Sequence, residues 1–258
     1  MDSIVKLEII SFALIYALLI IILFIMKKSQ IQQSKLLVWA SFRMTVQLIL
    51  AGWILTYIFE NPHPAFVLSY FLVMNIFAVH RVLSKNKSLN RKFKLAIALS
   101  LSLSGLAVLV FFILVVIGES LFNPQYVIPL SGMVVGNAMT GVTLGVKTFR
   151  ESFEGQRNRI QALLNLGVHP KKILLPFANQ ALETALLPTM NSMLGMGIVS
   201  LPGMMTGQIL SGTNPSTAVL YQIAIMIAIT SVVCVSVFSS LYLGYRTLYN
   251  EKYQMELP

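Results

Sequence analysis

Long apolar segments separated by short polar ones dominate this sequence. A helix that crosses the ~30 Å hydrocarbon core of a bilayer needs roughly 20 predominantly apolar residues. Seven segments approach that length, and we interpret each as a membrane-spanning helix. The predicted spans are Ile9–Met26, Leu36–Phe59, Pro64–Val79, Leu95–Gly118, Tyr126–Val146, Phe177–Ser200 and Ser216–Gly244. The pattern therefore predicts an all-α, polytopic membrane protein in which residues 1–258 form a single transmembrane domain.

One long polar segment, residues 147–176, interrupts the apolar pattern. Within it Ile160, Leu163, Leu164 and Gly167 recur at helical spacing, and a glycine followed by Pro170 is typical of a helix end. The segment therefore predicts a short amphipathic helix. Such a helix either lies in the lipid interface or docks a soluble subunit, and the pattern alone favours neither.

The composition excludes a large water-soluble core. The chain is 56% hydrophobic and 11% charged, with a mean hydropathy of +0.77, whereas ordinary soluble domains carry about 25% charged residues. From Thr184 to Tyr245 there is no Asp, Glu, Lys, Arg or His. That run suits two spans joined around Pro202–Pro215, where a re-entrant loop, a gate and a plain turn all fit. The first span lacks a basic start and a small-residue cleavage site, so we expect a retained anchor rather than a signal peptide.

The residues responsible for the net charge of +10 are concentrated in alternate loops. Lys and Arg occupy the first, third and fifth loops and the C-terminal tail, whereas the alternate loops hold Glu60 and Glu119 and no Lys or Arg. Cytoplasmic loops are enriched in Lys and Arg, so the N-terminus is expected outside and the C-terminus in the cytoplasm. The expected location is the cell (inner or plasma) membrane, in contact with lipid and with no nucleic-acid partner.

The sequence carries no positive signal for catalysis. Cys234 lies in the middle of a predicted span with no second cysteine to pair with, and the three histidines have no HExxH context. The segment Gly141–Thr148, GVTLGVKT, lacks the adjacent Gly-Lys of a phosphate-binding loop. We therefore expect no cofactor and no ATP hydrolysis by this chain itself.

A glycine stripe runs along the fifth predicted span. Gly132 and Gly136, then Gly141 and Gly145, repeat four residues apart, and small residues at that spacing let helix backbones approach closely in lipid. The stripe indicates either tight helix packing or an open backbone that lines a substrate path beside Asn137. A polar amide at membrane depth must find a partner in the bundle or in a cavity.

The sixth predicted span contains helix-breaking residues and methionines. Pro188 predicts a break in the helix, followed by Asn191 and two glycines. The methionines of this region either fill gaps in an apolar core or act as soft metal ligands. They are Met190, Met193, Met196, Met204 and Met205.

Two charged residues lie inside predicted spans. Arg43 is seven residues past Leu36, and Glu183 is seven past Pro176, so both are expected ~10 Å from the cytoplasmic side. Each charge is costly in lipid, which favours an ion pair between them or a place at the cytoplasmic entrance. Extension of the Arg43 side chain to the headgroups is an equally economical alternative.

Several motifs together resemble one family of ABC transporter permeases. Gln161-Ala162-x-x-x-Leu166-Gly167-x-x-Pro170 resembles the coupling loop of these permeases, with glutamine where the motif has glutamate. The most specific motif is SLPGMMTG at Ser200–Gly207. The remaining motifs are Arg43-x-x-x-Gln47, Gly132–Met139, Leu187-Pro188-Thr189 and Tyr221-Gln222. On these motifs the chain resembles the FetB family, implicated in iron export and, in plant relatives, in aluminium tolerance.

The resemblance implies a permease subunit rather than an enzyme. Two copies of the chain would form the pathway for iron or another metal cation, since glycine stripes suit a symmetric helix interface. A separate cytoplasmic ABC ATPase would dock on residues 147–176. The implied coupling residues are Gln161, Ala162, Leu166, Gly167, Pro170 and Lys171. The candidate pathway residues are Asn137, Asn191, Met193, Met196, Met204 and Met205.

Three alternatives stay open at this point. An ABC permease for a non-metal solute is one, because the plant branch has been linked to a nucleotide sugar. A gradient-driven secondary transporter is another, and Glu183 is its one candidate membrane-embedded acid. The third is a structural or signalling membrane protein whose polar loop binds a soluble partner other than an ATPase.

Overall fold

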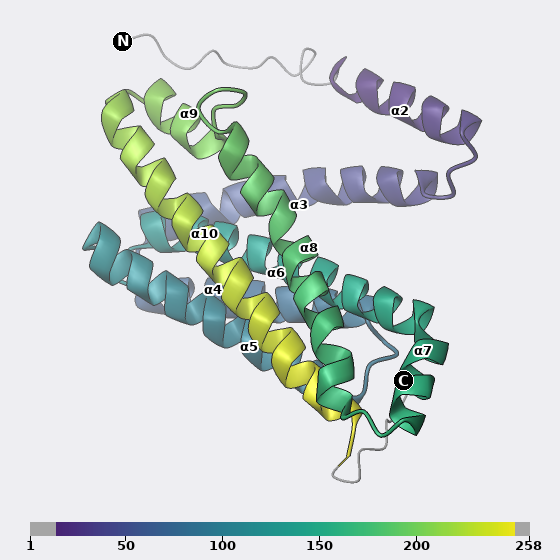
Figure 1. Cartoon of the computed structure of the whole chain (residues 1–258). Coiled ribbons are helices and arrows are strands. Elements are labelled where there is room, and N and C mark those ends of the chain that lie inside the picture. Colours follow the sequence, from purple (N-terminus) through teal and green to yellow (C-terminus); the bar gives the residue numbers. More distant parts are fainter. Residues whose placement is uncertain (1–13, 251–258) are drawn as a thin grey trace. The chain divides into compact units, whose positions relative to one another are not determined.

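A computed structural model of the chain describes residues 14–250, and between them every regular element is a helix. Figure 1 shows these helices in sequence order. The elements are α2 (Tyr16–Lys28), α3 (Ser34–Glu60), α4 (Pro64–Lys85), α5 (Arg91–Phe111), the π-helical turn η1 (Phe112–Ile117), α6 (Pro124–Gly155), α7 (Arg157–Asn165), α8 (Pro170–Gly195), α9 (Gly203–Leu210), α10 (Pro215–Gly244) and the 3₁₀ turn η2 (Tyr245–Leu248).

The described residues divide into two compact units, one of residues up to 62 with 210–212 and one of residues 63–209 with those from 213 onward. In the first unit, α2 and α3 form a hairpin whose turn contains Gln30 at a positive φ of 54°. A hydrogen bond between the hydroxyls of Tyr16 and Thr45 links its two helices. The second unit holds α4 to α10 and contains the candidate functional site.

Five described helices are long and apolar enough to cross a membrane: Ser34–Glu60, Pro64–Lys85, Arg91–Ile117, Pro124–Gly155 and Pro215–Leu248. Five of the seven predicted spans coincide with them, and the prediction of an all-α polytopic membrane protein is confirmed. The first predicted span, Ile9–Met26, begins outside the described residues. The sixth corresponds to α8, whose 26 residues are long enough at about 39 Å but include more polar side chains. The count of seven therefore stays a prediction.

Four of the long helices begin in the same way, with His or Asn followed by Pro. Proline is favoured at the first helical position because its missing N–H would have no partner there, and the preceding side chain can accept from an unpaired amide. The caps are Ala65 N to His63 Nδ1 (3.2 Å), Gln125 N to Asn123 Oδ1 (3.2 Å), Lys171 N to His169 Nδ1 (3.1 Å) and Ser216 N to Asn214 Oδ1 (3.0 Å). These caps fix the starts of α4, α6, α8 and α10.

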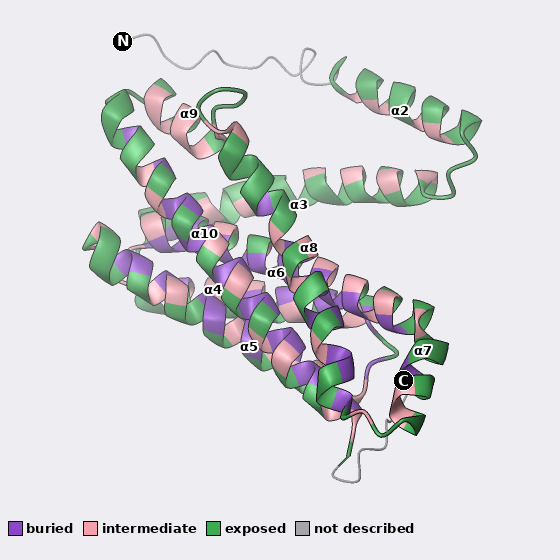
Figure 2. Cartoon of the chain, in the orientation of Figure 1, coloured by how far each residue is buried: buried purple, intermediate pink, exposed green. Residues whose placement is uncertain are grey.

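In the second unit α10 packs on α5, α6 and α8, and the buried residues run along these helices (Figure 2). Near the end of α10, Gly244 lies directly against the ring of the fully buried Phe93. Asn90 strengthens the same corner, because its side chain donates to Thr247 O at 2.9 Å and accepts from Phe93 N at 2.7 Å. The start of α5 is thereby joined to the end of α10.

Two sequence predictions about helix ends are wrong. The expected break at Pro188 is absent, since α8 continues through Pro176 and Pro188 to Gly195. Prolines are tolerated where neighbouring helices hold the segment, and Ala185 and Thr189 on either side of Pro188 are buried in the bundle. The segment expected to leave the membrane at Val146 is also still helical, because α6 extends to Gly155.

Candidate functional site

The short helix α7 and the turn that follows it lie at one end of the second unit, beside the start of α8 (Figure 1). Ile160 on α7 is fully buried, and Leu163, Leu164 and Val168 pack against the same core. The predicted amphipathic helix is thereby confirmed. Its apolar side faces the protein, so α7 is fixed to the bundle.

The turn after α7 is a hydrogen-bonded helix stop. Val168 N donates to Leu163 O at 3.0 Å and Gly167 N donates to Leu164 O at 2.9 Å, the two bonds of a Schellman motif. Gly167 has a φ of 77°, a conformation that side-chain-bearing residues rarely adopt. The sequence expectation that Gly167 ends the helix is confirmed, and Pro170 begins α8 as its first residue.

Replacing Gly167 with alanine is expected to destabilise this turn by about 1–2 kcal/mol, the cost of placing an L-residue in the left-handed region. The amides of Gly167 and Val168 should then exchange hydrogen for deuterium faster, which mass spectrometry can measure. Gly155→Ala is the matched control, because Gly155 has an ordinary φ and no described atom lies within 4 Å of a Cβ placed there. Equal exchange in both variants would contradict the role assigned to Gly167.

Five of the six predicted coupling residues lie on the outer surface of this turn. Gln161, Ala162, Gly167 and Lys171 are exposed, and Leu166 is an apolar side chain left 79% exposed. Pro170 is buried and serves as the joint between the turn and α8. The arrangement presents Leu166 on a fixed scaffold, which is the geometry that a docking helix needs.

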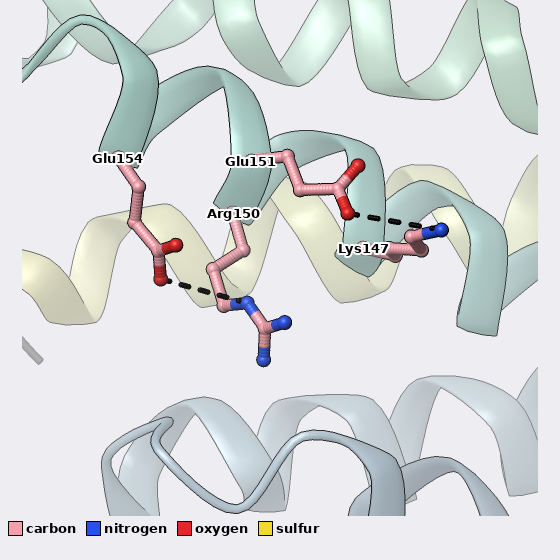
Figure 3. Close-up of polar contacts among 4 residues, drawn as sticks. All are labelled: Lys147, Arg150, Glu151 and Glu154. Atoms are coloured by element: carbon pink, nitrogen blue, oxygen red, sulfur yellow. Dashed lines mark ion pairs between the residues drawn. The ribbon is translucent and has the colours of Figure 1, made fainter. Parts of the chain in front are cut away.

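Charged side chains extend α6 beyond the membrane-length segment toward α7. Figure 3 shows Lys147 pointing to Glu151 and Arg150 to Glu154, with closest N–O distances of 3.7 and 3.6 Å. Both pairs are four residues apart, and both carboxylates and the Lys147 side chain are exposed while Arg150 is partly buried, so each pair stabilises the helix by only about 0.3–0.5 kcal/mol. They explain why a polar segment continues as helix.

The same end of the second unit gathers most of its basic residues. The end of α4, the start of α5, α7, the start of α8 and η2 meet here, and Asn90 and Thr247 join two of these segments. The residues are Lys85, Lys87, Arg91, Lys92, Lys94, Arg157, Arg159, Lys171, Lys172 and Arg246. Glu119 follows η1 at the other end of the bundle. The charge asymmetry predicted from the loops is therefore present in the folded second unit.

A cavity of about 250 Å³ opens between α6, α8 and α10. Its polar lining comes from Asn137, Thr140, Thr189 and Ser192, and its apolar lining includes Met196 and Met226. The Asn137 amide donates to Met133 O at 2.8 Å, and the Thr140 and Ser192 hydroxyls donate to carbonyls one turn back on their own helices. The amide and hydroxyl oxygens of these side chains supply neutral hydrogen-bonding groups from the middle of α6 and the last turns of α8.

The pathway candidates from the sequence divide into two groups. Asn137 and Met196 line this cavity, and Met193, Met196 and Met205 line a second one beyond it. Asn191 is exposed on α8 outside both linings, and Met204 packs against the hydrophobic core. Thr140, Thr189 and Ser192 were missed as pathway residues, although Thr140 and Ser192 fall one helical turn from Asn137 and Pro188 and Thr189 follows Pro188 directly.

The glycine stripe is used in two different ways. A Cβ at Gly141 would lie 2.7 Å from Val233 Cγ1, and one at Gly145 would lie 2.8 Å from Val237 Cγ1. At this half of the stripe, α6 packs tightly against α10 of the same chain. At Gly136 no described atom lies within 4 Å of such a Cβ, and at Gly132 the nearest is Met74 Cε at 3.8 Å. This half is free for a second chain or a substrate, whereas Gly141 borders the cavity between α6, α8 and α10 as well as packing on α10.

The two intramembrane charges fall in different units. Arg43 lies on α3 in the first unit, and Glu183 is exposed on α8 in the second. Their pairing stays a prediction. Within residues 14–250 no group of three or more His, Cys, Asp or Glu side chains is placed to hold a metal ion.

Comparison with known proteins gives a consistent result. The profile of the family described as "Uncharacterised protein family (UPF0014)" matches residues 9–249. The "Probable iron export permease protein FetB" of Escherichia coli (strain K12) is 31% identical over 245 residues, 95% of this chain and 93% of that protein. The "UPF0014 membrane protein YjkA" of Bacillus subtilis (strain 168) is 33% identical over 216 residues, 84% of this chain and 85% of its own.

A plant protein is related over nearly the whole length as well. "Protein ALUMINUM SENSITIVE 3" of Arabidopsis thaliana is 30% identical over 244 residues, 95% of this chain and 88% of that protein. No solved structure gives a significant match. The family resemblance inferred from the sequence motifs is thereby confirmed, and this multi-pass membrane protein belongs to the UPF0014 family.

Proposed function

We propose that this chain is the membrane-spanning permease subunit of an ABC transporter that exports iron or another metal cation, driven by a separate ATPase subunit. The observation that carries the proposal is the exposed Leu166, held on a rigid turn at the basic end of the bundle. An apolar side chain 79% exposed on a fixed, water-facing turn is suited to a pocket on a soluble partner. The printed name of the Escherichia coli relative, an iron export permease, supports both the class and the cargo.

The proposed orientation follows from charge. The basic end of the second unit, where the chain leaves η2 toward the C-terminus, faces the cytoplasm and the ATPase. With seven spans the N-terminus is outside the cell membrane. Two copies of the chain form the pathway, and the open half of the glycine stripe at Gly132 and Gly136 is the proposed contact between them. Lipid covers the remaining apolar faces.

Coupling works through α8. The docking turn is joined at Pro170 to one uninterrupted helix that reaches Ser192 in the cavity lining, about 33 Å away at the usual helical rise. ATP binding draws the two ATPases together and moves the docking turns with them. Because α8 continues through Pro188, this displacement reaches the cavity directly. Outward movement of a cation costs ~2.3 kcal/mol per charge per 100 mV, which ATP hydrolysis supplies.

The size and lining of the cavity favour an ion over a nucleotide sugar. Its volume of about 250 Å³ is below the roughly 300–1,000 Å³ typical of pockets for drug-sized ligands. None of its lining side chains is charged, so no Arg or Lys is present there to bind a diphosphate. A gradient-driven transporter is the second candidate function, favoured by Glu183, which is exposed on a membrane helix where a proton or cation can reach it.

The docking surface is tested by Leu166→Asp. Because Leu166 is exposed and its backbone φ is ordinary, the variant should fold normally, while a charge at the docking contact should lower co-purified ATPase activity at least fivefold in a mild-detergent pull-down. Asn158→Asp places the same charge on α7 away from the turn and should retain the ATPase. An ATPase recovered equally with both variants would rule out this docking surface. If the wild-type chain recovers no ATPase while Glu183→Gln abolishes gradient-driven transport, the second candidate is correct.

A further inference from the structure

A second cavity, of about 400 Å³, lies at the end of α8 opposite the docking turn. Four methionines line it: Met193 on α8, Met196 just after α8, Met205 on α9 and Met226 on α10. Gln222, one turn before Met226 on α10, is in the same lining. We call this set the methionine cavity. Methionine side chains from three helices and one connection thus line one cavity.

The backbone after α8 is built to bring these residues together. Gly195 ends the helix, and its carbonyl accepts from Val199 N at 2.9 Å and from Ser200 N at 3.2 Å. Gly197, at a φ of 82°, reverses the chain, and its N–H donates to Ser200 O at 3.0 Å. This closed loop places Met196 beside the start of α9. On α10, the Thr230 hydroxyl lies 3.2 Å from Met193 Sδ and orients that sulfur.

These four methionines border open space as well as other side chains. Methionine usually fills irregular gaps, yet here four of the chain's 13 methionines border open space, and Met193 is 40% exposed. Met226 also belongs to the hydrophobic core, and Met196 packs against it, so the cavity is bounded by the core on one side. Gln222 gives an independent indication of a ligand. It is buried, and its Oε1 has no hydrogen-bond partner in the part of the chain that the structure describes.

The side chains that line the two cavities favour a bound cation of low charge and soft character. The methionine cavity and the polar cavity beside it are lined by no charged side chain. The desolvation cost of an ion rises with the square of its charge, and a divalent ion in such a lining has no carboxylate or imidazole to offset that cost. Thioether sulfur is a soft ligand that favours Cu(I) over the harder divalent ions.

We propose that the methionine cavity binds a soft monovalent metal cation of the Cu(I) or Ag(I) class, held by thioether sulfurs and the Gln222 amide oxygen. Met196 and Met226 line both cavities, so the two share a wall through which the cation passes. As an assignment of cargo, this inference rests on the proposed transport function. As an assignment of a binding site, it stands on the lining alone.

The test is a calorimetric titration of the full purified chain with Ag(I) in detergent, using Cys234→Ser as the background because a free thiol also binds soft metals. Met-to-Leu changes remove sulfur at nearly constant volume. Replacing Met196 and Met226 together, or Met193 and Met205 together, should raise the Ag(I) dissociation constant at least tenfold. Met190→Leu with Met204→Leu is the matched control and should leave it within twofold, because neither residue lines the cavity.

Several outcomes would overturn the site. One is an unchanged dissociation constant when all four lining methionines are leucine. Another is Fe(II) displacing Ag(I) at equal concentration, which would mean that sulfur does not select the ion. X-ray absorption at the silver edge gives a direct readout, and a shell of only nitrogen and oxygen would also refute the assignment. The titration involves no ATPase and no nucleotide, so its failure is distinguishable from failure of the pull-down on the docking turn.

Discussion

Valine at both Gly141 and Gly145 is expected to destabilise the folded chain by about 2–6 kcal/mol, the sum of two overpacking costs of ~1–3 kcal/mol each. A Cβ at these positions would already lie 2.7 and 2.8 Å from methyl carbons of Val233 and Val237. Those valines are almost completely buried on α10 and stiff at χ1, so they cannot move aside without shifting the helix. The measurement is thermal unfolding in mild detergent, followed by size-exclusion chromatography.

The same helix offers a matched control. Gly132→Val with Gly136→Val adds the same carbons on α6, where a Cβ meets only ordinary contacts or open space among the described residues. This pair should leave the chain folded and instead weaken the proposed dimer. Val233→Ala with Val237→Ala should partly rescue the Gly141 and Gly145 variant by restoring room. If both double variants lost the same thermal stability, the packing of α6 on α10 would not be the reason that Gly141 and Gly145 must be glycine.

This contrast illustrates what a glycine stripe can and cannot predict. The spacing correctly indicated close helix packing, because a four-residue repeat puts small side chains on one face. Spacing does not identify the helix that packs against the glycines. At Gly141 and Gly145 that helix is α10 of the same chain. Gly244 had no periodic signal at all. Its contact with Phe93 depends on the meeting of α5 and α10, which only the tertiary structure reveals.

Helix ends show a similar division. The stop at Gly167 was predictable because its cause is local, a left-handed residue that closes a Schellman motif. Pro188 was misjudged because the local penalty of proline competes with burial of its neighbours Ala185 and Thr189 in the bundle. The extension of α6 to Gly155 was missed since charged residues at helical spacing were interpreted as loop. Helix ends that depend on local residues could be predicted from the sequence, whereas those that depend on tertiary packing could not.

The site was predictable in chemistry and only partly in position. Asn137 was noticed because a polar amide within a membrane span is costly unless it has a hydrogen-bond partner or a function. Thr140 and Ser192 were not chosen as pathway candidates, because hydroxyls in membrane helices commonly bond to their own backbone, as both do here. Asn191 was chosen by the same reasoning as Asn137, but it lies on a different face of α8 from Ser192, which lines the cavity. Residue type alone does not give the face of a helix.

Asn137→Leu should lower metal transport by at least tenfold, a loss of about 1.4 kcal/mol in the binding or passage of the cation. Leucine has nearly the shape of asparagine but removes the amide oxygen from the polar cavity, and Asn137 is exposed there, so folding should be preserved. ATPase co-purification should not change, because Asn137 lies on α6 far along the bundle from the docking turn.

Asn191→Leu is the control for this prediction, since it makes the same change on an exposed residue outside both cavity linings. Metal uptake into inside-out vesicles that contain the chain and its ATPase provides the measurement. A large loss in the Asn137 variant alone would identify the cavity between α6, α8 and α10 as the pathway. Equal transport by both variants would refute that pathway, and the open surface at Gly132 and Gly136 would then be the better candidate, because it is the part of α6 that neither packing nor the cavity uses.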